Sequence, residues 1–214
     1  MKSKPVIILG AGGHSKVLID VLKLFNTTIA GITDPNISLH GKSIMEVPVI
    51  GNDHLVLQYH PESILLVNGI GLTGQTSKRK QIFETFKKQN YCFLDVVHPN
   101  SVLASDVKTA EGVQIMAGAV IQTGTIIGDN TIINTRAGID HDCIIGSHVH
   151  IAPGATICGG VTVEDSVFIG AGATVIQGVH IGANSIVAAG AVVTCDVPEG
   201  VIVKGVPAKV VEKE

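Results

Sequence analysis

The chain has 214 residues, a formal net charge of −3 and no tryptophan; hydrophobic residues make up 45% of it and aromatic residues only 3%. This composition favours a core of Val, Ile and Ala, which suits a narrow prism better than a broad globule. The sequence has no basic run and no apolar stretch as long as a membrane span, so we expect neither nucleic acid nor a bilayer as a partner.

The first 98 residues predict alternating strands and helices, a pattern typical of a small parallel sheet with helices on its faces. The expected strands are 6–9, 29–33, 64–67 and 92–97, and the expected helices are 16–25 and 78–89. We predict a Rossmann-like domain over residues 1–98 and a second domain over residues 99–214. The strand at 6–9 is unlike a signal peptide and the four cysteines show no paired spacing, so we expect reduced thiols and a cytoplasmic protein.

A glycine-rich segment, Gly10-Ala11-Gly12-Gly13-His14-Ser15-Lys16, follows the first predicted strand and opens the first predicted helix. Free N–H groups and the helix dipole favour anions at such a turn, and His14 and Lys16 add two potential cations. The alternative is a tight strand–helix turn that needs glycines for positive φ.

A dinucleotide fingerprint would have a third glycine where this loop has Ser15, and a domain of 98 residues is too short for both halves of a dinucleotide fold. A mononucleotide, such as the UDP of a nucleotide sugar, fits better. Asp34, at the end of the second predicted strand, is placed to accept hydrogen bonds from a ribose or a base. A capping or turn role before Pro35 is the alternative.

Every sixth residue from position 115 to 193 is Ile or Val, and a small or β-branched residue stands four places after each. A period of six fits a solenoid in which each unit is one short strand and a corner, and three units close a triangular coil of about 18 residues. Stacked coils lie about 4.8 Å apart, so the run predicts a parallel β-helix of about four to five coils. The repeated aliphatics, expected to fill its interior, are Ile115, Ile121, Ile127, Ile133, Ile139, Ile145, Ile151, Ile157, Val163, Ile169, Val175, Ile181, Val187 and Val193.

Three histidines, His141, His148 and His150, lie close together in the sequence of the predicted β-helix. His141 follows an inward Ile by two residues, which places it on an outer edge, and Asp140 and Asp142 flank it. An imidazole beside a carboxylate suits a general base near neutral pH. A solvated corner histidine is one alternative, and a zinc site made by two or three of the histidines is another.

The chain resembles the group of hexapeptide-repeat enzymes that includes sialic acid O-acetyltransferases and bacillosamine N-acetyltransferases, and within it the UDP-4-amino-sugar N-acetyltransferases above all. The resemblance covers almost the whole chain. It rests on the glycine-rich segment 10–16, on Asn134-Thr135, on Asp140-His141-Asp142-Cys143 and on Gly205-Val206-Pro207-Ala208-Lys209.

The resemblance implies a homotrimer of left-handed β-helices, with acetyl-CoA as co-substrate between adjacent prisms and no metal. The left hand comes from the resemblance alone, because parallel crossovers are usually right-handed. It also implies that His141 is the general base and Asp142 its acidic partner. The implied acetyl-CoA contacts are His150, Gly159, Ala171 and Ala189, and the implied sugar-nucleotide contacts are Gly12, Gly13, His14, Asp34 and Gly71.

The predicted reaction is acetyl transfer to the 4-amino group of a UDP-linked amino sugar. His141 removes the amine proton, and Asn134 is a candidate orienting amide. We expect direct transfer, because the only nearby thiol, Cys143, falls in a repeat column that is normally buried. The alternatives are O-acetylation of a nonulosonic acid such as sialic acid, a zinc hydratase on the same prism, and a non-catalytic trimer that senses a nucleotide sugar.

Overall fold

The computed structural model describes residues 4–72 and 77–211, which form two compact units. The first unit contains residues 4–71 and 81–96, and the second contains residues 72, 77–80 and 97–211. Within the described residues, no helix is long and apolar enough to cross a bilayer.

The first unit is an α/β domain around a five-stranded sheet with the strand order β3-β4-β2-β1-β5. Four strands are parallel, and β3 forms an antiparallel hairpin with β4. The strands are β1 (Val6–Leu9), β2 (Ile29–Thr33), β3 (Ser43–Ile44), β4 (Val47–Gly51) and β5 (Leu65–Asn68). The helices are α1 (Gly13–Leu24), residues 81–87 of α2 (Ser77–Lys87), and three 3₁₀ segments, Ile37–Leu39, Asp53–Gln58 and Pro61–Ser63.

The core of this unit lies on the central strands. Ile7 and Leu9 of β1 are fully buried and pack in one cluster with Leu66 of β5, Phe83 and Phe86. Because β1, β2 and β5 are parallel, their carboxyl ends lie at one edge of the sheet, and the loops that follow them meet there.

The elements expected in this unit are largely confirmed, with one exception. The strand expected at 92–97 is wrong: only Phe93 bridges to Leu66 of β5, and Val96–Val97 forms β6, which belongs to a sheet of the β-helix. The apolar residues of this segment therefore serve two different cores. The sequence reasoning also missed β3 and β4, which lie between the second and third predicted strands.

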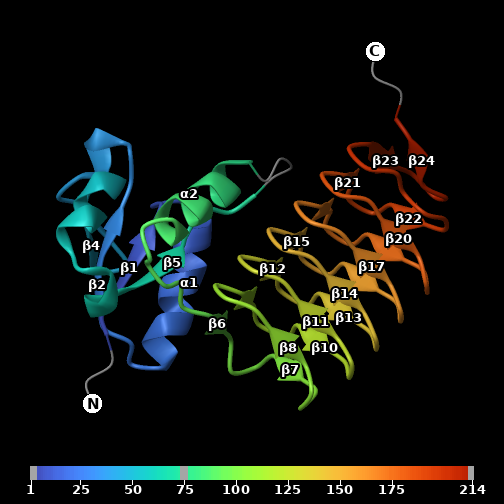
Figure 1. Cartoon of the computed structure of the whole chain (residues 1–214), viewed down its shortest axis with the longest axis horizontal. Helices are drawn as coiled ribbons and strands as arrows, with labels where there is room; N and C mark the ends of the chain where they lie inside the picture. Colours follow the sequence, from blue (N-terminus) through green and yellow to red (C-terminus); the bar gives the residue numbers. More distant parts are fainter. Residues whose placement is uncertain (1–3, 73–76, 212–214) are drawn as a thin grey trace. The chain divides into compact units, whose positions relative to one another are not determined.

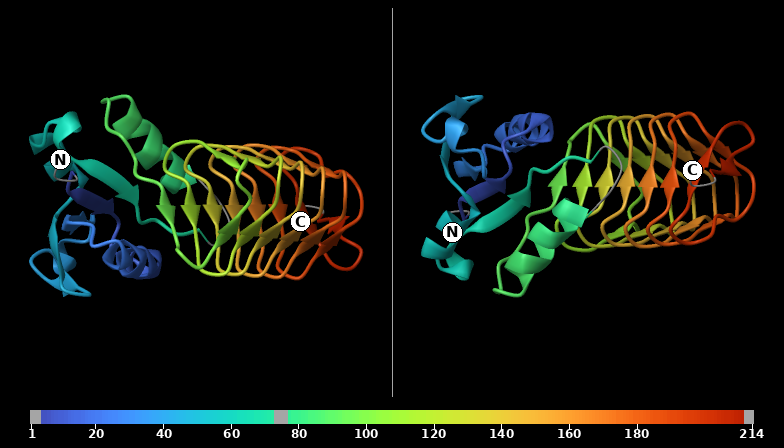
Figure 2. Two further views of the ribbon diagram at one scale, coloured as in Figure 1. Left: turned by 90° about the horizontal axis from the view of Figure 1, so that it is seen from below. Right: turned by 90° about the horizontal axis from the view of Figure 1, so that it is seen from above.

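The second unit contains a left-handed parallel β-helix of three sheets, whose stacked strands are visible in Figures 1 and 2. The first sheet contains β7 (Val102–Leu103), β10 (Val120–Ile121), β13 (Gly138–Ile139), β16 (Thr156–Ile157), β19 (Thr174–Val175) and β22 (Val192–Val193). The second contains β8 (Lys108–Thr109), β11 (Ile126–Ile127), β14 (Ile144–Ile145), β17 (Thr162–Val163) and β20 (His180–Ile181). The third contains β6 (Val96–Val97), β9 (Gln114–Ile115), β12 (Ile132–Ile133), β15 (His150–Ile151), β18 (Phe168–Ile169), β21 (Ile186–Val187), β23 (Ile202–Lys204) and β24 (Lys209–Val210).

The six-residue period is confirmed. All the repeated aliphatics from Ile115 to Val193 are at most 1% exposed, because the narrow interior accepts only side chains of similar volume. Stacked partners are 18 residues apart, as in the pairing of Ile121 with Ile139. The prism is longer than expected, since β6, β7 and β8 precede Ile115 in the same register. The series of Ile and Val does not extend to these strands, because Thr109 stands six residues before Ile115.

Three edges separate the sheets, and each is a stack of four-residue corners. The His141 edge, between the first and second sheets, comprises residues 104–107, 122–125, 140–143, 158–161 and 176–179. The His148 edge, between the second and third sheets, comprises residues 110–113, 128–131, 146–149, 164–167 and 182–185. The Asn134 edge, between the third and first sheets, comprises residues 98–101, 116–119, 134–137, 152–155, 170–173 and 188–191. Because the cross-section is triangular, each edge points away from the other two.

Candidate active site

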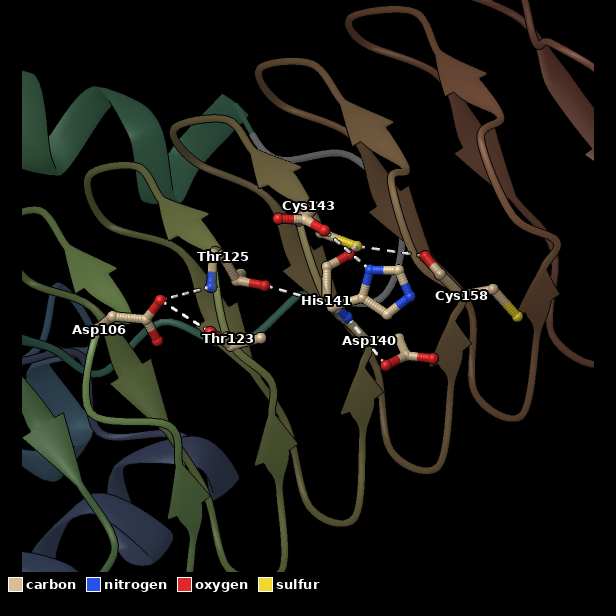
Figure 3. Close-up of polar contacts among 9 residues, drawn as sticks. Asp106, Thr123, Thr125, Asp140, His141, Cys143 and Cys158 are labelled. Carbon is tan, nitrogen blue, oxygen red and sulfur yellow. Dashed lines mark hydrogen bonds and ion pairs between the residues drawn. The ribbon is translucent and has the colours of Figure 1, made fainter.

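His141 and Asp142 form a hydrogen-bonded pair in the corner after β13; Figure 3 shows the imidazole of His141 on this corner, next to Asp140. The Nδ1–H of His141 donates to Oδ2 of Asp142 over 2.9 Å, and the backbone N–H of His141 donates to Oδ1 of Asp140 over 2.9 Å. The imidazole is 48% exposed. With the proton held on Nδ1, the Nε2 lone pair is available to accept another, which is the arrangement of a general base oriented by a carboxylate.

The two carboxylates raise the pKa of His141 above its ordinary value. The hydrogen bond to Asp142 contributes most, the negative charge of Asp140 contributes next, and partial desolvation opposes both. The result is an imidazole that holds a proton more strongly than a free histidine does.

The backbone of the corner aims the carboxylate of Asp142 at the imidazole. Asp142 has a left-handed conformation, with φ of 57°, that short polar residues such as Asp adopt more readily than most. Its N–H donates to the carbonyl oxygen of Thr123 on the preceding coil over 2.9 Å.

Cys143 is not placed to act as a nucleophile. Its side chain is fully buried, and Sγ donates to the carbonyl oxygen of Cys158 over 3.2 Å. Burial raises the pKa of the thiol, which disfavours the reactive thiolate.

Gly159 stands directly against the imidazole, on the coil that follows His141. A Cβ atom built on Gly159 would lie 2.6 Å from both Cε1 and Nε2 of His141, so only a glycine leaves room for the ring. Among the described residues, none accepts a hydrogen bond from the Gly159 N–H. This donor is therefore available beside the basic nitrogen.

A hollow of about 240 Å³ lies on the first sheet beside Asp140. Its lining residues are Val120, Gln122, Gly138, Ile139, Asp140, Thr156, Ile157 and Cys158. Gly138 occupies a strand position at which its neighbours in the same column are Val120 and Thr156. The sequence reasoning missed this hollow, although a glycine at a strand position of the repeat was a usable signal.

Asn134 does not contact His141 within the chain. It lies on the Asn134 edge, where its Nδ2–H donates to Nε2 of His150 over 3.2 Å. His150 points outward from β15, yet it is only 4% exposed and its ring meets that of Phe168 edge to face. Ala171 and Ala189 are exposed residues on successive coils of the same edge.

His148 lies on the His148 edge, so His141, His148 and His150 do not form one cluster. It is 7% exposed, and its Nδ1 lies 3.0 Å from Nδ2 of Asn130. The carbonyl oxygen of Asn130 in turn accepts a hydrogen bond from Nε of the buried Arg79 over 3.2 Å. In the part of the chain that the structure describes, no three His, Cys, Asp or Glu side chains are grouped to hold a metal ion.

The predicted sugar-nucleotide residues meet in the first unit, at the carboxyl edge of its sheet. Gly12 is the N-cap of α1, and a Cβ atom on Gly12 or Gly13 would meet nothing within 4 Å. Gly71 lies against His14, since a Cβ atom on it would be 3.0 Å from Cβ of His14. Among the residues that the structure describes, no side chain caps α1, so its first turn presents N–H groups beside these residues.

Asp34 and Ser15 tie the loops of this edge together. The Asp34 carboxylate accepts the N–H of Ala11 through Oδ2 and the N–H of Asn36 through Oδ1, each over 2.8 Å. Asp34 thus fills the turn role that was the alternative, and each of its oxygens keeps a lone pair for a ligand. Ser15, in place of the third glycine, donates to the carbonyl oxygen of Gly69 over 3.1 Å.

Family models match most of the chain. Residues 5–86 match the PglD N-terminal domain. Residues 124–159 match the bacterial transferase hexapeptide model of six repeats, and residues 160–195 match the hexapeptide repeat of succinyl-transferase. These matches confirm the resemblance that the motifs indicated.

Several solved structures share the whole fold. The perosamine N-acetyltransferase from Caulobacter crescentus is 36% identical, with a TM-score of 0.90, and the match covers 98% of this chain and 97% of that chain. It was solved as a histidine variant in complex with CoA and GDP-perosamine. The acetyltransferase domain of PglB from Neisseria gonorrhoeae, in complex with acetyl coenzyme A, is 32% identical with a TM-score of 0.90, covering 98% and 100%. WeeI from Acinetobacter baumannii is 27% identical with a TM-score of 0.81, covering 98% and 100%.

Proposed function

This chain belongs to the hexapeptide-repeat sugar N-acetyltransferases that carry a PglD N-terminal domain, and on that premise we propose that it acetylates the 4-amino group of a UDP-linked amino sugar with His141 as general base. Its co-substrate is acetyl-CoA, the ligand with which the acetyltransferase domain of PglB was solved. The observation that carries the proposal is the His141–Asp142 pair on an exposed edge, beside a hollow of about 240 Å³.

The reaction is direct transfer. The neutral amine attacks the thioester carbonyl, a C–N bond forms, and Nε2 of His141 takes one proton from the amine nitrogen. The tetrahedral intermediate then collapses, the C–S bond breaks, and the sulfur leaves with the bonding electrons. The imidazolium returns its proton to that sulfur, so the products are the amide and free CoA. The buried Cys143 supports this route over an acyl-enzyme.

Two groups stabilise the charges that develop. The Asp142 carboxylate faces Nδ1 of His141 and favours the imidazolium that forms after proton transfer. Gly159 packs against the imidazole, and its N–H, which makes no hydrogen bond among the described residues, is available to donate to the negative oxygen of the intermediate. Such a preorganised donor acts without reorganisation during the reaction, which is why it lowers the barrier.

The acceptor nucleotide belongs to the first unit in this proposal. Gly12, Gly13 and His14 surround the open N-terminus of α1, which favours a phosphate. Asp34 lies across the loop, with one lone pair on each oxygen available to a ribose or a base. GDP is the alternative to UDP, because the perosamine N-acetyltransferase, at 36% identity, binds GDP-perosamine.

The assembly is a trimer in which two copies complete each site. His141 and Gly159 lie on the His141 edge, whereas Asn134, Ala171 and Ala189 lie on the Asn134 edge. Two edges of one triangular prism face different directions, so one ligand contacts both sets only when a second copy supplies the second edge. A cyclic trimer repeats this heterologous contact three times. All four cysteines are free, which fits a reducing, cytoplasmic compartment.

An acceptor panel tests the function. CoA release and product mass are measured with acetyl-CoA and a UDP-linked 4-amino sugar, its GDP-linked counterpart or CMP-sialic acid. We expect the UDP sugar to turn over fastest, and His141→Ala to lower kcat by about 10²–10⁴-fold with little change in the KM of acetyl-CoA. Faster turnover of the GDP sugar would show that the acceptor carries GDP and not UDP. Acetylation of CMP-sialic acid alone would show that the reaction is O-acetylation of a sialic acid. A near-normal kcat in an assembled His141→Ala enzyme would show that His141 is not the general base.

A further inference from the structure

The carboxylate that orients His141 rests on a glycine of the preceding coil. A Cβ atom built on Gly124 would lie only 2.4 Å from Oδ1 of Asp142 and 3.3 Å from its Cγ. A side chain at position 124 therefore requires the Asp142 carboxylate to leave the place from which it contacts His141.

The left-handed backbone of Gly124 does not by itself require glycine. Its φ is 75°, and the equivalent positions of the next three coils are Asp142, Gly160 and Gly178, with φ of 57°, 67° and 73°. Asp142 shows that a residue with a side chain occupies this place in the corner. At Gly160 and Gly178 a Cβ atom would meet nothing within 4 Å. The contact with Asp142 thus distinguishes Gly124 from these two glycines of the His141 edge.

Asp106, on the preceding coil, holds the corner that carries Thr123 and Gly124; its contact with Thr123 is visible in Figure 3. Oδ2 of Asp106 accepts the Oγ1–H of Thr123 over 2.8 Å and the N–H of Gly124 over 3.0 Å. The carbonyl oxygen of Thr123 in turn accepts the N–H of Asp142 over 2.9 Å. Asp106, two coils before Asp142, therefore fixes both Thr123, whose carbonyl oxygen holds the backbone of Asp142, and Gly124, against which the Asp142 carboxylate packs.

We propose that Gly124 and Asp106 are positioning residues for His141: Gly124 leaves the space that the Asp142 carboxylate occupies, and Asp106 holds Gly124 in place. This inference rests on the proposed function, since it takes His141 to be the base. Neither residue touches the reacting atoms. Their effect passes through Asp142, so it falls on the basicity and orientation of the imidazole and not on acetyl-CoA binding.

Gly124→Ala tests the first half, with Gly178→Ala as the control on the same edge. A contact of 2.4 Å must lengthen to about 3.4 Å, so the carboxylate moves about 1 Å, and a displacement of that size near the chemistry costs about 10²-fold in kcat. We expect this loss with an unchanged KM for acetyl-CoA. Gly178→Ala carries the same backbone strain without the contact and should keep the wild-type kcat. Equal kcat in the two assembled variants would overturn the role of Gly124.

Asp106→Ala and Asp106→Asn test the second half. The alanine variant loses both hydrogen bonds, and we expect kcat to fall at least about tenfold, the lower end for losing an outer-shell partner. The asparagine variant keeps an oxygen that can accept both bonds, so it should recover most of the activity. The same loss in both variants, or in neither, would refute positioning by Asp106. This pair also decides the question if Gly124→Ala fails to assemble.

The NMR titration of the His141 ring gives a readout that does not depend on turnover. Asp142 and Asp140 are the charged groups that face the ring from its own corner, and Gly159 faces it from the next coil. Since the hydrogen bond to Asp142 contributes most to the raised pKa of His141, that pKa should fall in Gly124→Ala and in Asp106→Ala, but not in Gly178→Ala. His141→Asn identifies the signal among the nine histidines. If the wild type acetylates no acceptor, the proposed function fails. The titration of His141 then decides by itself whether Gly124 and Asp106 position the imidazole.

Discussion

Replacing Gly159 by alanine should separate the geometry of the site from the stability of the fold. The added Cβ atom would lie 2.6 Å from Nε2 of His141, whereas ordinary contact begins near 3.4 Å, so the ring has to move by about 0.8 Å. A misplacement of about 1 Å near the reacting atoms costs about 10²-fold in kcat. Gly159 is not among the residues with positive φ, so alanine adds no backbone strain there.

The neighbouring Gly160 provides the matched control. Its φ of 67° makes alanine cost about 1–2 kcal/mol of stability, but the new Cβ atom would meet nothing within 4 Å. We therefore expect Gly160→Ala to melt at a lower temperature with nearly normal kcat, and Gly159→Ala to melt near the wild-type temperature with a much lower kcat. Melting curves and initial rates of CoA release measure both. A Gly159→Ala enzyme with the wild-type kcat would show that catalysis does not depend on the observed position of the His141 imidazole.

Three further results are expected. Asp142 raises the pKa of His141, and only the neutral imidazole accepts a proton. Asp142→Asn should therefore shift the rising limb of the pH profile of kcat/KM to lower pH and lower its plateau. A rising limb at the wild-type pH would show that the His141–Asp142 pair is not the group that titrates. If sites are shared, refolding His141→Ala together with Asn134→Ala should restore activity that neither variant has alone, whereas no recovery in mixed trimers would place each site within one chain. Ile145 lies in the interior, so Ile145→Ala should lower the free energy of unfolding by about 2–5 kcal/mol. The side chain of Ile144 points outward, so Ile144→Ala should change it by about 0.5 kcal/mol or less. Chemical unfolding measures both, and equal effects would contradict the inward register.

The repeat and the place of the candidate base, His141, were predictable from the sequence because both depend on local position. A residue of the β-helix faces inward or outward according to its place in the six-residue unit. That rule alone identified the buried column from Ile115 to Val193 and put His141 on an outer corner. The acidic neighbours of His141 are adjacent in the chain, so the carboxylate that contacts it was predictable as well.

Contacts between coils required the structure, although the 18-residue repeat contained their signal. Gly159 follows His141 by 18 residues and Gly124 precedes Asp142 by 18. These offsets place each glycine against its partner, but only the conformation of the corners shows that a Cβ atom would collide there and not at Gly178.

The separation of the histidines was decided by the tertiary structure alone. His141 and His148 are seven positions apart, and that spacing carries the chain from one corner of the triangle to the next; His150 then falls on a sheet and pairs with Asn134. Sequence proximity suggested one cluster, and the closing of each coil disperses it. The first unit behaves in the same way, because Asp34 meets the glycine turn only when β2 lies parallel to β1. Local pattern therefore determined which residues face inward or outward, and the path of the backbone between them determined which residues meet.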